Sequence, residues 1–361
     1  MTAEHIRWPS LSTSAQEVAL PRLAAALLRG ALVVIPTETV YGLAANALDA
    51  NAVAKIYAAK GRPARNPLIV HVASVAMAQN LVTEWPASAS RLVERFWPGP
   101  LTLVLPKQPV IPDVATADGP TVALRCPATD CTRRLIELVG VPLAAPSANR
   151  SNYLSPTRTE HLEPELLAQV DFVLDAGPCT GGIESTVVDL TEAQVRLLRP
   201  GLVTRERLET LLGPIAVGPR AGTFTPRSPG QLARHYAPRT PLFLFSKARD
   251  VLRRLHELQP ANQRIGVVGF GQAKSGRSSG KLRFHPAVTR VQWLLDDPDG
   301  YANRIYEVLH ELDRQRLDSI LLLLPPAEPA WLAVRDRLLR AGQLMNDSCP
   351  EKAAKEGASG P

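Results

Sequence analysis

The segment from Pro36 to His71 constrains the fold of this chain most strongly, because it predicts a strand, a helix and a second strand in close succession. The apolar run Ala31–Ile35 is typical of a buried strand, and a proline follows it directly. Asp49 is a suitable N-cap for the helix, and Gly61 is a typical stop signal. Leu68–Val72 predicts the second strand. The segment therefore indicates a strand–helix–strand unit of an α/β protein.

Polar side chains surround this unit. Thr37, Thr39 and Tyr41 follow the first strand at intervals of two residues, so their hydroxyls point the same way if the chain stays extended there. Lys60 and Arg62 come where the predicted helix ends. Each residue alone has an ordinary structural explanation, because a basic side chain in a last helical turn complements the helix dipole and a threonine after a strand bonds local backbone.

Asn66 and His71 add directional hydrogen-bonding groups to the same unit. A lone histidine in an apolar strand is more often structural than a ligand. The residues near His71 favour a functional role, because Lys60 and Arg62 supply fixed positive charge of the kind that binds phosphate or carboxylate. On the residues alone, an anion-binding site and an ordinary polar strand edge remain equally open.

The ordered motifs of the chain resemble those of the threonylcarbamoyl-AMP synthase family, the YrdC-like enzymes. The resemblance begins with PTETVYGL at residues 36–43, the Lys60-Gly61-Arg62 triplet and NPLIVH at residues 66–71. It extends in the family's order through TVALR at 121–125, APSAN at 145–149, Ser155-Pro156-Thr157, GIESTV at 182–187 and LRPG at 198–201. Ser228-Pro229-Gly230 and His235-Tyr236-Ala237-Pro238 are similar to the linker of the longer, two-domain members.

Two positions depart from the family pattern. Ser151-Asn152 stands where Ser-Gly is usual, and Ala176 precedes Gly177 where a Gly-Gly pair is common. Asparagine tolerates a positive φ better than most residues, so we expect Asn152 to preserve the turn. Ala176 fits poorly only if its position requires a positive φ.

A chain of 361 residues exceeds the size at which single cores usually stop growing, so we expect two domains. The first, residues 1–215, is predicted to be a YrdC-like α/β domain with a twisted mixed sheet and helices. Residues 216–240, rich in Gly, Pro, Arg and Ser, are predicted to be a linker or lid. Residues 241–345 alternate strand and helix and predict a smaller, parallel, Rossmann-like α/β domain. Residues 346–361 are predicted to be a disordered tail.

The individual elements can be placed approximately from hydrophobic patterns. In the first domain they are strands at 101–105, 121–126, 143–145, 172–175, 186–190 and 195–198, with helices near 75–81 and 88–96. In the second they are strands at 242–245, 265–268 and 320–324, with helices at 248–258, 301–316 and 330–341.

Known nucleotide-binding fingerprints are absent from the sequence. Gly266, Gly269 and Gly271 are spaced G-x-x-G-x-G, which is not the dinucleotide fingerprint, and turns at a strand end explain them. There is no Walker P-loop. If ATP binds, side chains and ordinary loop amides must hold its phosphates.

Composition excludes several classes of protein. The four cysteines, Cys126, Cys131, Cys179 and Cys349, form no C-x-x-C pair, which argues against structural zinc and against a disulfide framework. We therefore expect a cytoplasmic protein. No apolar run approaches the length of a membrane span, and the first residues lack a signal peptide pattern. Acidic and basic residues nearly balance in residues 1–219, whereas residues 220–345 carry the basic excess.

The resemblance implies an activity. L-Threonine and bicarbonate or CO2 would form N-carboxythreonine, whose carboxylate attacks the α-phosphorus of ATP to give threonylcarbamoyl-AMP and pyrophosphate. The product would pass to a tRNA threonylcarbamoyl transferase complex that modifies the adenosine beside the anticodon. Magnesium is expected with the nucleotide, but the sequence shows no carboxylate cluster dedicated to it. Glu184 is the nearest carboxylate to a binding residue, and a surface turn acid explains it equally well.

The resemblance also implies roles for residues at the matching positions. Lys60 and Arg62 would be catalytic through their charge near the phosphates, and Arg125 would clamp the threonine carboxylate. His235 and Tyr236 would belong to a segment that folds over the site as a lid. The implied threonine site is Thr39, His71, Arg125, Ala145 and Ser185; the implied ATP site is Arg62, Asn66, Thr121, Ser147, Ser155, Arg199, His235 and Tyr236.

Two other functions remain open. A carbamoyl-transfer enzyme of hydrogenase maturation carries the same kind of domain, but those chains are longer and have C-x-x-C zinc fingers, which this sequence lacks. A non-catalytic RNA-binding module is favoured by the basic C-terminal part, and direct tRNA contact is compatible with either function. Such a module predicts salt-dependent RNA binding that survives loss of Arg62 or Arg125.

Overall fold

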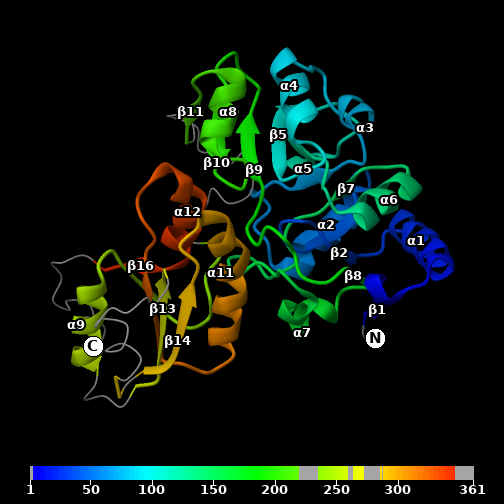
Figure 1. Ribbon diagram of the computed structural model, residues 1–361. Helices are drawn as coiled ribbons and strands as arrows, with labels where there is room; N and C mark the ends of the chain where they lie inside the picture. Colours follow the sequence, from blue (N-terminus) through cyan, green and yellow to red (C-terminus); the bar gives the residue numbers. More distant parts are fainter. Residues whose placement is uncertain (1–2, 219–234, 259–262, 272–284, 287, 346–361) are drawn as a thin grey trace, which may run out of the picture.

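The computed structural model describes residues 3–218, 235–258, 263–271, 285–286 and 288–345. These residues form two α/β parts, each built on its own sheet (Figure 1). The first sheet has eleven strands in the order β1-β8-β2-β3-β7-β4-β6-β5-β9-β10-β11, and the second has five in the order β14-β13-β15-β12-β16. The predicted fold class, a mixed α/β sheet followed by a smaller parallel one, is confirmed.

The first part contains short helices between its strands. Its strands are β1 (Glu4–Arg7), β2 (Val33–Ile35), β3 (Gly42–Asn46), β4 (Ile69–His71), β5 (Leu101–Pro106), β6 (Thr121–Arg125), β7 (Leu143–Ala144), β8 (Phe172–Asp175), β9 (Thr186–Asp189), β10 (Arg196–Arg199) and β11 (Ala216–Val217). Its helices are α1 (Thr13–Leu28), α2 (Ala50–Lys60), α3 (Val75–Gln79), α4 (Ala87–Phe96), α5 (Asp113–Thr116), α6 (Asp130–Val139), α7 (Pro164–Leu167) and α8 (Arg205–Leu212).

The alternation of side chains along β2 explains how helices cover both faces of the first sheet. Val33 and Ile35 belong to a core cluster with residues of α1 and α6, whereas Val34 belongs to the cluster that contains residues of α2 and α4. Successive residues of a strand point to opposite faces, so a fully apolar strand is what a sheet covered on both sides requires.

The predicted helix is confirmed as α2, but a strand that the sequence did not predict, β3, lies between β2 and this helix. Asp49 caps α2 by accepting hydrogen bonds from the backbone N–H groups of Asn51 and Ala52. The helix ends at Lys60, and Gly61 follows in the left-handed conformation with φ of 56°. These two signals fix where Lys60 and Arg62 stand.

Strand register at the centre of the first sheet brings two predicted site residues together. β4 pairs in parallel with β6, which places His71 opposite Arg125. β4 also pairs with β7 in antiparallel fashion, and β5 joins β6 to β9. The carboxyl ends of β4 and β6 therefore meet at one edge of the sheet.

The second part is a parallel sheet with helices on both faces. Its strands are β12 (Leu242–Phe245), β13 (Ile265–Phe270), β14 (Val288–Leu294), β15 (Ser319–Leu323) and β16 (Gln343–Leu344), and its helices are α9 (Ala248–Leu258), α11 (Pro298–Asp313) and α12 (Leu332–Ala341). Residues of α9 pack on one face of the sheet, and residues of α11 and α12 pack on the other.

Only one of the three glycines near β13 is a turn glycine. Gly271 has a φ of +81°, but Gly266 and Gly269 lie inside the strand. A Cβ on Gly269 would lie 2.3 Å from the ring of Trp293, so this glycine leaves room for an aromatic side chain on the neighbouring strand. Strand-end turns, the explanation favoured by the sequence, therefore account for Gly271 alone.

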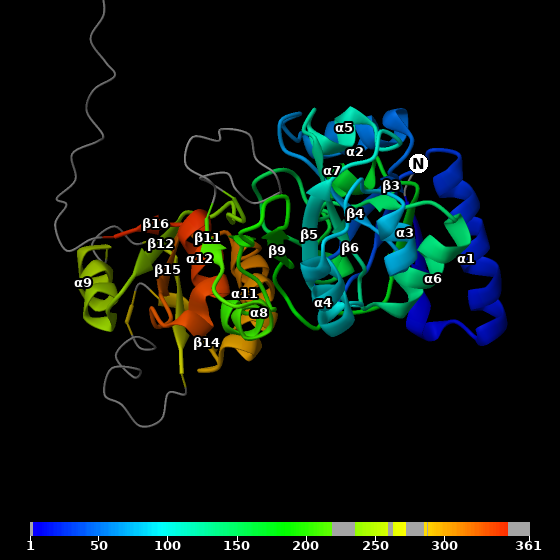
Figure 2. The same ribbon diagram turned by 90° about the horizontal axis from the view of Figure 1, so that it is seen from above.

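The helices α11 and α12 lie between the second sheet and the first part, as Figures 1 and 2 both show. Val40 and Ile183 of the first part share a core cluster with Ile305 and Tyr306 of α11. The two parts therefore meet through a common apolar core beside the turn after β2.

The edges of the first part are set by short strands. β11 pairs in parallel with β10, so the first sheet continues to Val217, two residues beyond the boundary expected at 215. Residues 219–234 of the expected linker and the expected tail 346–361 lie outside the described residues. Within the described ranges, no helix combines the length and apolar character needed to cross a lipid bilayer.

Candidate active site

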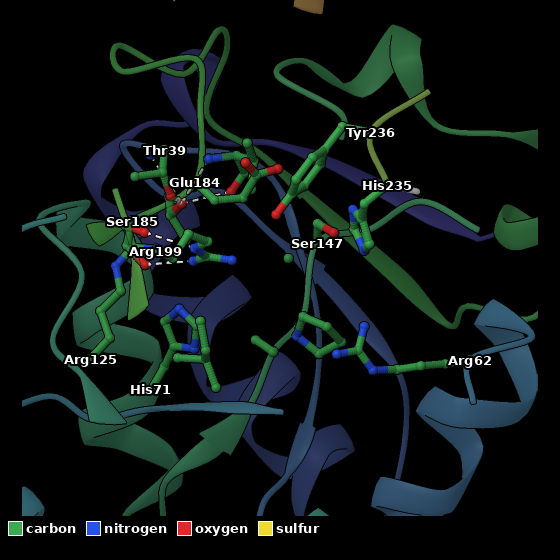
Figure 3. A pocket seen from close by; sticks show the side chains of 16 residues that line it. Thr39, Arg62, His71, Arg125, Ser147, Glu184, Ser185, Arg199, His235 and Tyr236 are labelled. Atoms are coloured by element: carbon green, nitrogen blue, oxygen red, sulfur yellow. Dashed lines mark hydrogen bonds between the residues drawn. The ribbon is translucent and has the colours of Figure 1, made fainter. Parts of the chain in front are cut away.

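A polar pocket lies where the carboxyl ends of β4 and β6 meet the residues just before β9 and the end of β10 (Figure 3). Of the residues singled out in the sequence, the pocket wall contains Thr39, Arg62, His71, Arg125, Ala145, Ser147, Ser185, Arg199, His235 and Tyr236. In Figure 3, Thr39, Ser185, Arg199, Arg125 and His71 lie on one side of the pocket, and Arg62 and His235 lie on the other.

Arg125 is held in an orientation that suits a carboxylate. Its Nη2 donates to Oε1 of Glu38 at 2.7 Å, and its side chain is only 4% exposed. Glu38 in turn accepts a hydrogen bond from the backbone N–H of Ala128. A guanidinium has five N–H donors, so Arg125 keeps donors for the carboxylate of a ligand.

His71 faces the pocket from β4 as a neutral ring. Burial, reinforced by the neighbouring charge of Arg125, lowers the pKa of His71 to about 3. The imidazole can therefore donate one hydrogen bond and accept another at neutral pH.

Ser185 and Arg199 are locked together. Arg199 donates from Nε to the backbone carbonyl of Ser185 at 3.0 Å and from Nη2 to its Oγ at 3.1 Å. The Oγ of Ser185 also lies 2.8 Å from Oγ1 of Thr102 on β5. The pairing of β9 with β10 and β5 brings these three side chains together.

Arg62 stabilises the turn that leads into β4. Its Nε donates to the carbonyl of Asn66 at 2.9 Å and its Nη2 to that of Pro67 at 2.8 Å. Burial lowers the pKa of Arg62 to about 10, so the side chain remains a cation at neutral pH. The pocket therefore receives fixed positive charge from this side as well.

Lys60 does not line the pocket. Its Nζ donates to the backbone carbonyls of Ser147 and Asn149, and the residue is only 1% exposed. Burial, followed by the charge of Arg62, holds the pKa of Lys60 well below its usual value. From its position at the end of α2, the Lys60 amine points to the loop after β7. Its link to the pocket is indirect, because it bonds the backbone of Ser147, which lines the pocket.

Three other expected ATP ligands also lie outside the pocket wall. Asn66 is buried, and its Nδ2 has no hydrogen-bond partner among the described residues. Thr121 is at the opposite end of β6 from Arg125, roughly 13 Å away along the strand. Ser155 donates its hydroxyl to Oε1 of Glu184.

Tyr41 does not share the direction of Thr37 and Thr39. The Oγ1 atoms of the two threonines lie 2.8 Å apart, but the hydroxyl of Tyr41 donates to the carbonyl of Gly177 at 2.7 Å. The chain is not extended here, because Oγ1 of Thr37 accepts hydrogen bonds from the backbone N–H groups of Thr39 and Val40 and so bends it.

The two departures from the family motifs leave the backbone relaxed. Asn152 adopts a φ of 73°, which confirms that this position takes a left-handed residue. Gly177 has a φ of 83°, whereas Ala176 is not among the residues with positive φ. The alanine therefore fits its position without strain.

Glu184 and Thr37 are pocket residues that belong to neither the implied threonine site nor the implied ATP site. Glu184 is not a surface turn acid, since it is 6% exposed and pairs with Arg337 at 2.7 Å. The sequence signal that could have indicated a buried position for Glu184 is its place directly before Ser185 in the GIESTV motif. Its partner lies 153 residues further along the chain, and no local pattern indicates it.

The nitrogens of His235 complete the polar wall. Both are buried without a hydrogen-bond partner among the described residues, and burial lowers the pKa of His235 to about 3. Buried polar atoms are normally satisfied, so these nitrogens suit a bound ligand. Among the residues that the structure describes, no three His, Cys, Asp or Glu side chains lie close enough together to hold a metal ion.

The fold and this pocket together define a class of protein: a YrdC-like α/β domain whose arginine-lined polar pocket is walled in part by the segment leading to a second, parallel α/β domain. Family comparisons agree. A model for the Sua5, yciO and yrdC group, described as Telomere recombination, matches residues 25–201. A model described as Threonylcarbamoyl-AMP synthase, C-terminal domain, matches residues 203–342. The chain belongs to the threonylcarbamoyl-AMP synthase family.

Individual relatives are similar over nearly the whole chain. Threonylcarbamoyl-AMP synthase of Pyrococcus abyssi is 41% identical over 329 residues, which are 89% of this chain and 93% of that protein. The Bacillus subtilis protein of the same name is 38% identical over 336 residues, 92% of this chain and 94% of that protein. The crystal structure of P. abyssi Sua5 complexed with L-threonine has a TM-score of 0.84 at 36% identity and covers 96% of this chain and 100% of that chain.

Proposed function

We propose that this chain is an L-threonylcarbamoyladenylate synthase, a nucleotidyltransferase that converts L-threonine, bicarbonate or CO2 and ATP into threonylcarbamoyl-AMP and pyrophosphate. The observation that carries the proposal is the pocket itself, which sets Arg125, His71, Thr39 and Ser185 opposite Arg62 and His235. One side offers a carboxylate clamp with hydrogen-bonding groups for an amino acid. The other offers charge and open nitrogens for a nucleotide.

The chemistry needs positioning more than a protein nucleophile. The carboxylate of N-carboxythreonine forms the new bond to the α-phosphorus, and the bond from that phosphorus to the pyrophosphate oxygen breaks. Arg125 would hold the threonine carboxylate, while Arg62 and Arg199 would neutralise charge on the phosphates. Neutral His71 would orient the substrate by hydrogen bonding.

The residues present do not form a dedicated magnesium site, because the described carboxylates do not cluster and Glu184 is paired with Arg337. Magnesium bound to ATP would take most of its ligands from phosphates and water. His235 and Tyr236 would limit the access of water to the labile product. We propose a cytoplasmic enzyme whose product goes to a tRNA threonylcarbamoyl transferase complex.

The test is pyrophosphate release by the purified full chain with ATP, bicarbonate and magnesium. We expect release with L-threonine, far less with L-serine, and none without an amino acid. If no pyrophosphate is released under any of these conditions, the synthase proposal is rejected. The RNA-binding module would then be the remaining hypothesis, and a measurement of salt-dependent RNA binding would test it.

A further inference from the structure

The second part of the molecule, the second domain, contacts the pocket wall from behind through one buried cation, Arg337 on α12. This side chain is 1% exposed, and its Nε lies 2.7 Å from Oε2 of Glu184. Its Nη2 also donates to the backbone carbonyl of Glu184 at 3.3 Å. The guanidinium carbon lies 5.2 Å from the centre of the Tyr236 ring. Arg337 thus contacts two residues of the pocket wall, and its Nη1 also pairs with Oδ2 of Asp336 on its own helix at 2.8 Å.

Glu184 is surrounded by further donors. Ser155 donates to Oε1 at 2.5 Å, and the hydroxyl of Tyr306 on α11 lies 3.2 Å from Oε2. Although burial opposes ionisation, the charges of Arg337 and Arg199 hold the pKa of Glu184 below its ordinary value. The carboxylate is therefore a buried anion in the pocket wall at neutral pH.

The loop that carries Glu184 is held against α11 by close backbone contacts. A Cβ on Gly182 would lie 2.3 Å from the carbonyl oxygen of Ala302, and Gly182 has a φ of +79°. Nδ2 of Asn303 donates to the carbonyls of Cys179 and Thr180. The second domain therefore fixes the backbone of this loop as well as the side chain of Glu184.

An ionised carboxylate in the wall is unfavourable for a polyanionic ligand unless its charge is compensated. ATP is such a ligand, and the other charged groups of the wall, Arg62, Arg125 and Arg199, are all cations. Arg337 stands next to Glu184, on the side of the second domain. It is the cation that pairs directly with Glu184, so together with Arg199 it compensates the carboxylate, without itself lining the pocket.

We propose that Arg337 is a positioning residue of the active site, which compensates and orients Glu184 so that the pocket accepts the nucleotide. Through it the second domain sets the affinity for ATP. This inference rests on the proposed function, because it concerns the nucleotide of that reaction.

The decisive experiment compares four full-length proteins in the pyrophosphate assay: the wild type, Arg337→Met, Glu184→Gln and the double variant. Arg337→Met removes the cation that pairs directly with Glu184 and leaves the carboxylate only partly compensated, so we expect its KM for ATP to rise about tenfold or more and its KM for L-threonine to change far less. The double variant removes both charges and should recover most of the ATP affinity. Arg335→Met is the matched control and should behave as the wild type, because Arg335 lies on the same helix but donates to the carbonyl of Pro325 and not to Glu184.

The outcomes separate this inference from the proposed function. Inactive wild-type protein would reject the function. An active wild type with no recovery in the double variant, or with equal losses for ATP and L-threonine, would overturn the role of Arg337. If Arg337→Met does not fold, Glu184→Gln decides: charge compensation predicts a KM for ATP no higher than the wild type's, whereas a merely structural pair predicts a rise.

Discussion

The imidazole rings of His161 and His310 stack with their centroids 4.0 Å apart and their planes at 18°, one ring from each of the two parts of the molecule. Burial lowers the pKa of His161 to about 2 and that of His310 to about 4. The ring of His310 also lies 3.1 Å from the carbonyl of Ser155, beside the pocket wall. Two neutral histidines thus contribute to the contact between the domains.

This pair should make the protein sensitive to acid. The unfolded chain takes up protons near pH 6.5 whereas the folded pair does not, so stability is greatest above pH 6.5 and falls as the pH drops toward 4. Each histidine contributes up to about 1.4 kcal/mol per pH unit in that window. Urea unfolding at pH 7 and pH 5 measures the loss. His310→Gln should reduce it, and the exposed His5→Gln should not; equal slopes for both variants would contradict the assignment.

Arg125→Lys should weaken threonine binding. Lysine keeps the charge but loses the planar pair of donors, so the KM for L-threonine should rise about 10- to 100-fold, corresponding to the loss of one charge-assisted contact. The KM for ATP should change little. Steady-state pyrophosphate release measures both, and Arg133→Lys on the surface is the control. A selective loss of ATP affinity would show that Arg125 does not hold the amino acid.

Gly201→Ala should disturb the backbone at Ser185, directly before β9. A Cβ at residue 201 would lie 2.4 Å from the backbone nitrogen of Thr186 and 2.7 Å from the carbonyl carbon of Ser185. We expect a destabilisation of about 1–3 kcal/mol together with a raised KM for L-threonine. Gly213→Ala is strained only by its φ of +81° and meets open space, so it should cost stability without changing KM. Thermal unfolding and kinetics of both variants test this difference.

Lys60→Met should loosen the loop after β7. The variant leaves the carbonyls of Ser147 and Asn149 without their donor, which costs about 1–3 kcal/mol of stability for buried acceptors. Turnover should fall as well, because Ser147 lines the pocket. Lys55→Met, in the middle of the same helix, removes a hydrogen bond to the carbonyl of Gly30 and should keep its activity. Full activity in a destabilised Lys60 variant would separate the loop from catalysis.

Local signals were sufficient for much of this fold. The apolar run before Pro36, the cap at Asp49 and the stop at Gly61 predicted β2 and α2 because each depends on neighbouring residues alone. The helix α1 was missed: Pro21 lies inside it, and proline normally ends a helical pattern. The strand β1 is short and polar, and it exists only because β8 pairs with it.

The candidate site was predictable where a motif and a strand end coincide. His71 and Arg125 close two neighbouring strands, so a motif match and the parallel pairing place them together. The predictions for the side chains of Lys60 and Tyr41 were wrong about where these side chains point. Each side chain is long or bulky, and its orientation depends on which distant backbone carbonyl it reaches. Arg337 could not be found from sequence at all, since its importance comes from a domain contact and not from any pattern on α12.

Strand β1 pairs along its whole length with β8, Glu4 opposite Phe172 and Arg7 opposite Asp175. Because a chain is synthesised from its N-terminus, β1 is made long before its partner β8 and stays unpaired until then. Pairing between such distant segments slows folding, because the intervening loop must close before any contact compensates for it. The large sheet can be completed only late in synthesis, and until β8 is made the emerging chain exposes unpaired strand edges that favour aggregation.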